Sequence, residues 1–208
     1  MDSNKEHLDN LSEIRSLMER SSSFLSLSGL SGVCAGILGI ISAVIMKLKF
    51  ASQVNYQDYV FLNSAQRVEL LTFGIILMLA TLILTFTFVI FFTVRKAKKN
   101  NLPIWDSSAK NLLINLFIPL VTGGLFCILL VYHAYDWLVL PSMLVFYGLA
   151  LINAGKYTLD EIRWLGLTEI FLGLLAAAFF SMTIWLWGIG FGVMNIIYGL
   201  VMYFRHER

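Results

Sequence analysis

Glu169 is the acidic residue that lies deepest inside an apolar stretch of this sequence. It is the one acid in the segment Trp164–Leu175, which reads WLGLTEIFLGLL. A carboxylate buried without a partner is costly, so the group either takes up a proton or pairs with a positive charge. Such a carboxyl group could therefore carry a proton or bind a cation. The alternative is a structural role, in which the group anchors two helices through hydrogen bonds. The sequence leaves both roles open.

Polar side chains at a similar depth are the expected partners of Glu169. Asn195 lies near the middle of the last apolar segment, between two glycines. The other candidates stand near the ends of neighbouring apolar segments: Ser31, Asn153, Lys156 and Arg163. With Glu169 they form the predicted buried polar site, whose small-molecule or ion ligand the sequence does not identify.

Glycines recur at helical spacing and predict close packing of apolar helices. Gly166 and Gly173 flank Glu169 at spacings of three and four residues, which directs Glu169 toward a neighbouring helix and away from lipid. A second series near the N-terminus is spaced three, four and three residues apart, so its members share one helix face. The predicted packing glycines are Gly29, Gly32, Gly36, Gly39, Gly166, Gly173, Gly192 and Gly199.

The residues of known catalytic motifs are missing from the apolar segments. The histidines His7, His133 and His206 all lie outside these segments, and HExxH, GxSxG and phosphate-loop motifs are absent. An intramembrane Ser–His pair would need a histidine within a span, and two-aspartate proteolysis would need a second buried acid. Cys34 and Cys127 lie in apolar segments, where cysteine behaves as a small hydrophobic residue. We therefore expect no enzyme, no metal and no cofactor.

The composition predicts an integral membrane protein of the all-α class. The chain has 208 residues, of which 58% are hydrophobic and 13% charged, whereas soluble proteins carry about 25% charged residues. The net charge of +2 gives no reason to expect nucleic acid. A helix of about 20 apolar residues crosses a bilayer. Six transmembrane spans are predicted, at about 24–46, 70–94, 112–132, 137–154, 164–181 and 187–204.

The positive charges predict the orientation of these spans. Twelve of the fifteen Lys and Arg residues fall in segments that would share the side of the N-terminus, and such residues mark the cytoplasmic side. We expect both termini in the cytoplasm of a bacterium, with an amphipathic helix over 1–23 and a tail at 205–208. The expected partners are the lipid bilayer and a second copy of the chain, bound through the amphipathic helix or the glycine faces.

The spans are predicted to form three tandem hairpins related by an internal repeat. Phe146-Tyr147-Gly148-Leu149 matches Ile197-Tyr198-Gly199-Leu200 at an offset of 51 residues, and Gly123 matches Gly173 at an offset of 50. Because the hairpins share one orientation, the repeat would be parallel. Many transporters instead have an inverted repeat.

Two long motifs resemble a family of small six-span bacterial membrane proteins of the kind found in Bacteroidetes. The first is LSEIRSLMERSS ahead of SLSGLSG, and the second is YGLALINAGKYTLDEIRWLGLTEIFLGLL. The resemblance covers both ends of the chain and implies a six-span fold, but it implies no activity. The glycine-rich layout of three hairpins is also similar to HdeD-type acid-stress membrane proteins, in architecture alone.

Two functions of different classes follow. The first is a non-enzymatic membrane protein with a structural or sensory role in envelope stress. The alternative is a small transporter or channel that uses Glu169 with Asn153 and Asn195. A transporter predicts a water-filled cavity that reaches Glu169, whereas a structural role predicts a dry, hydrogen-bonded carboxyl group.

Overall fold

The computed structural model describes residues 28–53, 64–99 and 107–206, and these are helical apart from short turns. The helices are α2 (Gly29–Gln53), α3 (Ser64–Lys99), α4 (Ser107–Tyr132), α5 (Val139–Ala154), α6 (Asp160–Ala178), α7 (Thr183–Gly188) and α8 (Asn195–His206). A π-helical segment, Ile189–Met194, joins α7 to α8 without a break. The prediction of an all-α protein is confirmed for these residues. The predicted helix over 1–23 lies outside them, as do the last two residues of the tail.

Five helical stretches are long and apolar enough to cross a membrane, which indicates an integral membrane protein. They are Gly29–Ala51, Ala65–Lys99, Ser108–Tyr132, Asp136–Tyr157 and Phe180–Arg205. Helix α6 is not among them, because its 19 residues include Asp160, Glu161 and Arg163 besides Glu169. A sixth span at α6 therefore stays a prediction.

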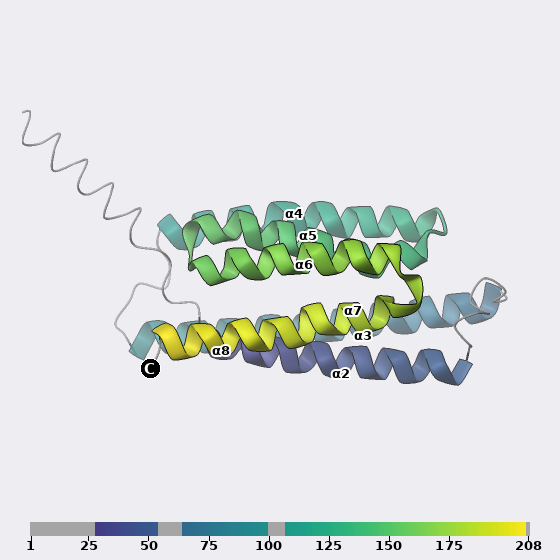
Figure 1. Cartoon of the computed structure of the whole chain (residues 1–208), viewed down its shortest axis with the longest axis horizontal. Helices are drawn as coiled ribbons and strands as arrows, with labels where there is room; N and C mark the ends of the chain where they lie inside the picture. Colours follow the sequence, from purple (N-terminus) through teal and green to yellow (C-terminus); the bar gives the residue numbers. More distant parts are fainter. Residues whose placement is uncertain (1–27, 54–63, 100–106, 207–208) are drawn as a thin grey trace, which may run out of the picture.

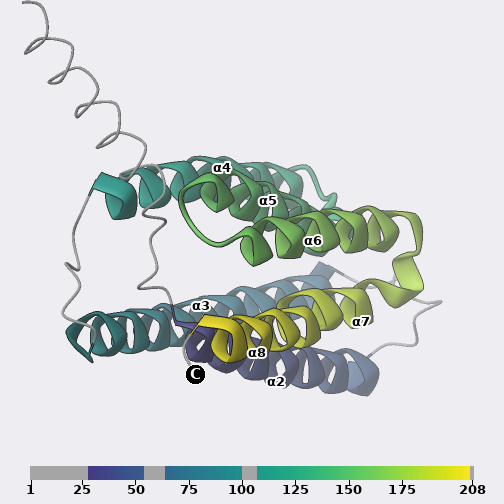
Figure 2. The same ribbon diagram turned by 60° about the vertical axis from the view of Figure 1, so that its left-hand side comes forward.

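The helices form two layers (Figures 1 and 2). One layer holds α4, α5 and α6, with α5 packed against both of the others. The second holds α2, α3 and the continuous α7–α8, with α2 packed against both α3 and α8. Helix α6 also contacts α7, the π-helical segment and α8, and so joins the layers. We call the end where α2 begins and α8 ends the terminal end, and the opposite end the hairpin end.

The glycines predicted to pack helices face other backbones of the same chain. A Cβ atom at Gly36 would lie 2.5 Å from the Gly192 carbonyl oxygen, and one at Gly166 would lie 2.7 Å from the Gly148 carbonyl oxygen. Such distances leave room for glycine alone, so α2 approaches α8, and α6 approaches α5, unusually closely. The other predicted packing glycines meet these same helix pairs: Gly29, Gly32, Gly39, Gly173 and Gly199.

The turn between the last two helices lies earlier than the predicted break between 181 and 187. Helix α6 ends at Ala178 and α7 begins at Thr183. The Thr183 hydroxyl donates a hydrogen bond to the Ala176 carbonyl oxygen at 3.0 Å, which closes the turn. Trp187 consequently lies within the helix and faces the protein interior, where it is 7% exposed.

Candidate functional site

Glu169 lies where the two layers meet, and its side chain is fully buried, with 0% exposure. It extends from α6 toward the π-helical segment. There its Oε2 atom and the Leu144 side chain occupy the space that a side chain at Gly190 would need. The glycine at position 190 thus makes room for the carboxyl group. Gly166 and Gly173, its helical neighbours, face α5.

A hydrogen-bonded pair of polar side chains lies beside Glu169. The Tyr147 hydroxyl of α5 donates to Asn195 Oδ1 at 3.0 Å, and Asn195 Nδ2 donates to the Gly190 carbonyl oxygen at 3.3 Å. Gly190, whose carbonyl oxygen accepts this second hydrogen bond, is the residue against which the Glu169 carboxyl group lies. We call Tyr147, Glu169, Gly190 and Asn195 the interlayer cluster. It draws on α5, α6 and the last helix, so it spans both layers.

The π-helical segment shapes the cluster on its α8 side. The segment reads IGFGVM. Its two glycines, Gly190 and Gly192, lower the stability of an ordinary α-helix at this point. Asn195 lies five residues beyond Gly190 and bonds its carbonyl oxygen through the side chain, which supports the wide turn. Single π-helical turns are rare and occur frequently at functional sites.

Glu169 differs from the other buried acids of the described residues in its lack of a partner. Asp136 pairs with Arg67, and Glu161 pairs with Arg205 at 2.9 Å. Within the described part of the chain, neither carboxyl oxygen of Glu169 has a hydrogen-bond partner. An uncompensated charge there would be costly, so the surroundings favour the neutral acid.

Glu169 is the only His, Cys, Asp or Glu side chain of the interlayer cluster. Over 28–53, 64–99 and 107–206, no group of three or more His, Cys, Asp or Glu side chains could hold a metal ion. The interlayer cluster offers one carboxyl, one amide and one hydroxyl group. What it can do chemically is hold and release a proton at the Glu169 carboxyl group.

Of the predicted partners of Glu169, only Asn195 lies in the interlayer cluster. Ser31 donates to the Ser28 carbonyl oxygen at 2.6 Å, and Asn153 donates to the Asn115 carbonyl oxygen at 3.1 Å. Lys156 donates to Asn153 at 3.4 Å and is exposed, as is Arg163. The last three lie around the α5–α6 turn at the terminal end. Glu169 is nine residues into α6, or roughly 14 Å along its axis.

Two members of the cluster were missed by the reasoning from sequence. In the sequence Tyr147 belongs to a repeated Tyr-Gly pair, and the signal for its role is that a tyrosine within an apolar helix usually needs a hydrogen-bond partner. The sequence signal for the π-helical segment is the spacing of Gly188, Gly190 and Gly192, which recur every second residue. That spacing does not follow one face of an α-helix.

No family model, no curated protein and no solved structure matches this chain. The geometry of the interlayer cluster is therefore the basis for a functional conclusion.

Proposed function

We propose that this chain is a non-enzymatic integral membrane protein with a structural or sensory role, seated in a bacterial cytoplasmic membrane and acting in envelope stress. The observation that carries the proposal is the position of Glu169. It is fully buried between two helix layers, with no hydrogen-bond partner among the described residues. A purely structural anchor would be hydrogen-bonded, whereas an unpartnered acid lowers stability. We therefore favour a sensory role.

The sensing step would be a change in the charge of Glu169. As a neutral acid the group tolerates an apolar site, but as a carboxylate it needs water or a cation. Arg67 and Arg205 do not neutralise this carboxylate, because Arg67 pairs with Asp136 and Arg205 pairs with Glu161. Water can reach the charged group only if α6 moves away from the π-helical segment. Charging Glu169 would thus separate the layers.

The orientation belongs to the same proposal. Basic residues gather at the terminal end, with Lys96, Lys98 and Lys99 in the last turn of α3 and Lys156 in the α5–α6 turn. This distribution supports a cytoplasmic terminal end, with both termini inside. A homo-oligomer would use the N-terminal segment or a lipid-facing surface, because the predicted glycine faces meet helices of the same chain.

The proposed movement can be measured as a distance between the layers. Spin labels at Leu79 of α3 and Leu125 of α4 would report it, since these residues are 56% and 60% exposed and belong to different layers. Cys34 and Cys127 are first replaced by alanine. In lipid bilayers, we expect the distance between the labels to increase as the pH is raised.

The matched control is Glu169→Gln, which keeps the size of the side chain but cannot become charged. In this variant the distance should stay constant over the same pH range. A label pair within one layer, at Leu125 and Leu149, should not respond in either protein. An equal response of wild type and Glu169→Gln, or none in wild type, would contradict a sensory role for this residue.

A small transporter or channel is the second candidate function, and the π-helical segment is the observation that favours it. A wide turn packed on a buried acid could change its hydrogen bonding as the acid gains and loses a proton. In liposomes, Glu169→Gln should abolish proton or cation flux with the fold intact, whereas Glu161→Gln should retain it. Absence of flux from wild type would contradict this candidate.

A further inference from the structure

A cavity lies between the layers near the hairpin end, away from Glu169. Its volume is about 120 Å³, and α3, α5 and α7 provide most of its wall. A second, inner cavity of about 20 Å³ adjoins it. The two share lining residues from four helices: Met46, Gly74, Met78, Leu140 and Ile184. The two cavities together form one path, which runs from Arg67 and Asp136 inward to Ser42 and Trp187. We call this whole path, including its inner part, the outer cavity.

The lining of the outer cavity is almost entirely apolar. The Arg67–Asp136 ion pair stands at its hairpin end. The other polar lining residues are Thr183 and Ser42, whose hydroxyl groups bond the Ala176 carbonyl oxygen and Thr81, and the rest of the lining is apolar. Apolar cavities of comparable size stay free of water and take up apolar molecules. Methionine side chains adapt their shape to such a guest. The lining therefore suits a hydrocarbon group.

The outer cavity reaches the surface that would face lipid. Ile75 and Trp137 line it and are 49% and 40% exposed. Of the α3 residues that line it, Leu70 and Gly74 are buried, whereas Leu71, Ile75 and Met78 are at least partly exposed. A molecule dissolved in the bilayer could therefore enter sideways between α3 and α5. A solute from water would have to pass the Arg67–Asp136 pair.

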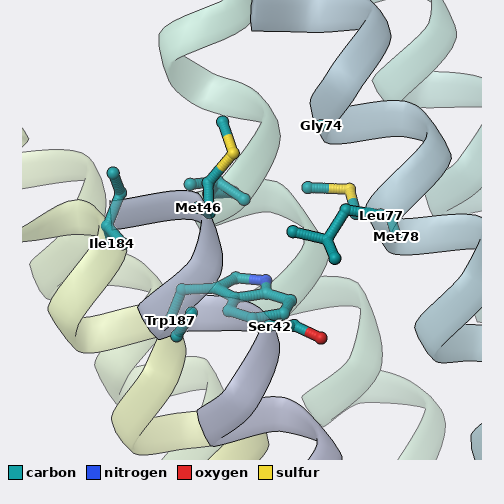
Figure 3. Close-up of a pocket in the computed structure, with 9 residues that line it drawn as sticks. Ser42, Met46, Gly74, Leu77, Met78, Ile184 and Trp187 are labelled. Carbon is teal, nitrogen blue, oxygen red and sulfur yellow. The ribbon is translucent and has the colours of Figure 1, made fainter. Parts of the chain in front are cut away.

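One polar group inside the outer cavity lacks a partner. Trp187 is 7% exposed, and its Nε1–H has no acceptor among the residues that the structure describes. Figure 3 shows the nitrogen edge of the indole facing the space between Met46 and the side chains of Leu77 and Met78. A buried N–H without an acceptor is costly. A guest with an oxygen atom at this depth would remove that cost.

We propose that the outer cavity binds a bilayer amphiphile, in which an apolar chain carries one oxygen acceptor for Trp187 Nε1–H. The apolar wall holds the chain, and the single unpartnered donor selects molecules with an acceptor. The site is separate from the interlayer cluster and does not depend on the role of Glu169. A contact series joins the two, because Phe191 stacks on Tyr147 at 4.7 Å between ring centres and packs at a tilt against Trp187 at 4.9 Å.

Fluorescence quenching can test occupancy directly. One variant keeps Trp187 and replaces the four other tryptophans by phenylalanine, and a companion keeps only Trp185. Trp185 lies two residues away and is 56% exposed, so it reports on bulk lipid. The full chain in phosphatidylcholine vesicles receives methyl 4,5-dibromostearate, whose bromine atoms lie close to the ester group and quench tryptophan on contact. We expect saturable quenching of Trp187 at low mole fraction and gradual, unsaturated quenching of Trp185.

Filling the cavity should distinguish binding of the brominated ester inside the cavity from its random collision with the protein in the bilayer. Gly74 lines both parts of the path, and Gly74→Leu would place a side chain in it. Gly124→Leu is the matched control, because nothing lies within 4 Å of a Cβ atom at that position. Gly74→Leu should abolish saturable quenching of Trp187, and Gly124→Leu should leave it unchanged. If Gly74→Leu does not fold, as judged by circular dichroism, Met78→Phe fills the same space.

The acceptor is tested with 4,5-dibromooctadecane, which has the chain but no oxygen. The ester should half-saturate quenching at about fivefold lower mole fraction, the effect of one hydrogen bond. Equal half-saturation would overturn the assignment of Trp187 as the selecting donor. The proposed binding site would be overturned if Trp187 showed no saturable quenching. It would also be overturned if neither Gly74→Leu nor Met78→Phe changed that quenching.

Discussion

Glu169 lies 0% exposed between two helix layers, beside an amide and a hydroxyl group that bond each other and not the carboxyl group. The groups around it therefore accommodate an acid without stabilising its charge. An arrangement of this kind lowers the stability of the fold, and the change of charge proposed for Glu169 would account for it.

Replacing Glu169 by methionine should make the protein more stable. The two side chains have similar length, and the change removes a buried polar group with no described partner. We expect the free energy of unfolding to rise by about 1–3 kcal/mol, as measured by denaturation in detergent micelles. A loss of stability would show that the carboxyl group makes a stabilising interaction.

Gly190→Ala tests the contact between the π-helical segment and the acid. The new methyl group would collide with Glu169 Oε2 and would lie 2.6 Å from a Leu144 methyl carbon. Overpacking of this kind should lower stability by about 1–3 kcal/mol. Adding Glu169→Ala should restore part of the loss, because both changes act on one space. Additive effects of the two changes would place the carboxyl group away from Gly190.

At the scale of elements, the two close helix pairs define the layers. Helices α2 and α8 lie together in one layer, α5 and α6 in the other, and glycines at their crossings let the backbones touch. The spacing of these glycines, and the length of the apolar runs, could be recognised in the sequence because they repeat over many residues. The rotation of one helix about its neighbour leaves no such pattern. The Tyr147–Asn195 bond joins residues 48 positions apart and depends on that rotation.

Alanine at Gly36 should weaken the α2–α8 crossing. Its Cβ atom would lie 2.5 Å from the Gly192 carbonyl oxygen, a backbone atom that cannot move alone. We expect a loss of about 1–3 kcal/mol in the free energy of unfolding. Gly124→Ala is the control, since its Cβ would meet nothing within 4 Å, and should be neutral or gain up to about 1 kcal/mol from helix propensity. Similar effects of the two would contradict the close crossing.

The α4–α5 turn offers a stabilising change. Ala134 has a φ angle of 63°, and Tyr135 N–H donates to the Leu130 carbonyl oxygen at 2.8 Å, which is the Schellman arrangement that favours glycine. Ala134→Gly should raise stability by about 1 kcal/mol, visible as a higher melting temperature. Ala134→Val should lower it, because a β-branched residue tolerates this conformation poorly. The reverse order would contradict the turn geometry.

At the scale of the whole molecule, α6 connects the two layers, because it packs against α5 in one layer and against α7, the π-helical segment and α8 in the other. It is also the helix that meets the composition of a membrane span least well, since Asp160, Glu161 and Arg163 stand near its start. The apolar runs of the sequence predicted both layers' helices but not how they group, because layer membership depends on contacts between distant segments. Glu169 was found because it is a charge in an apolar run. Of its surroundings, Asn195 was predicted but Gly190 was not, because the π-helical segment that receives the carboxyl group has no counterpart in an ideal helix.

The central claim is that Glu169 is a neutral acid in a dry site between the layers. Infrared spectroscopy of the protein in bilayers, with glutamate labelled by ¹³C at the carboxyl carbon, measures this directly. We predict a carbonyl band of a protonated acid at neutral pH that disappears in Glu169→Gln and shifts only slowly after transfer to D₂O. A carboxylate band in its place, or a shift as fast as that of surface groups, would contradict the claim.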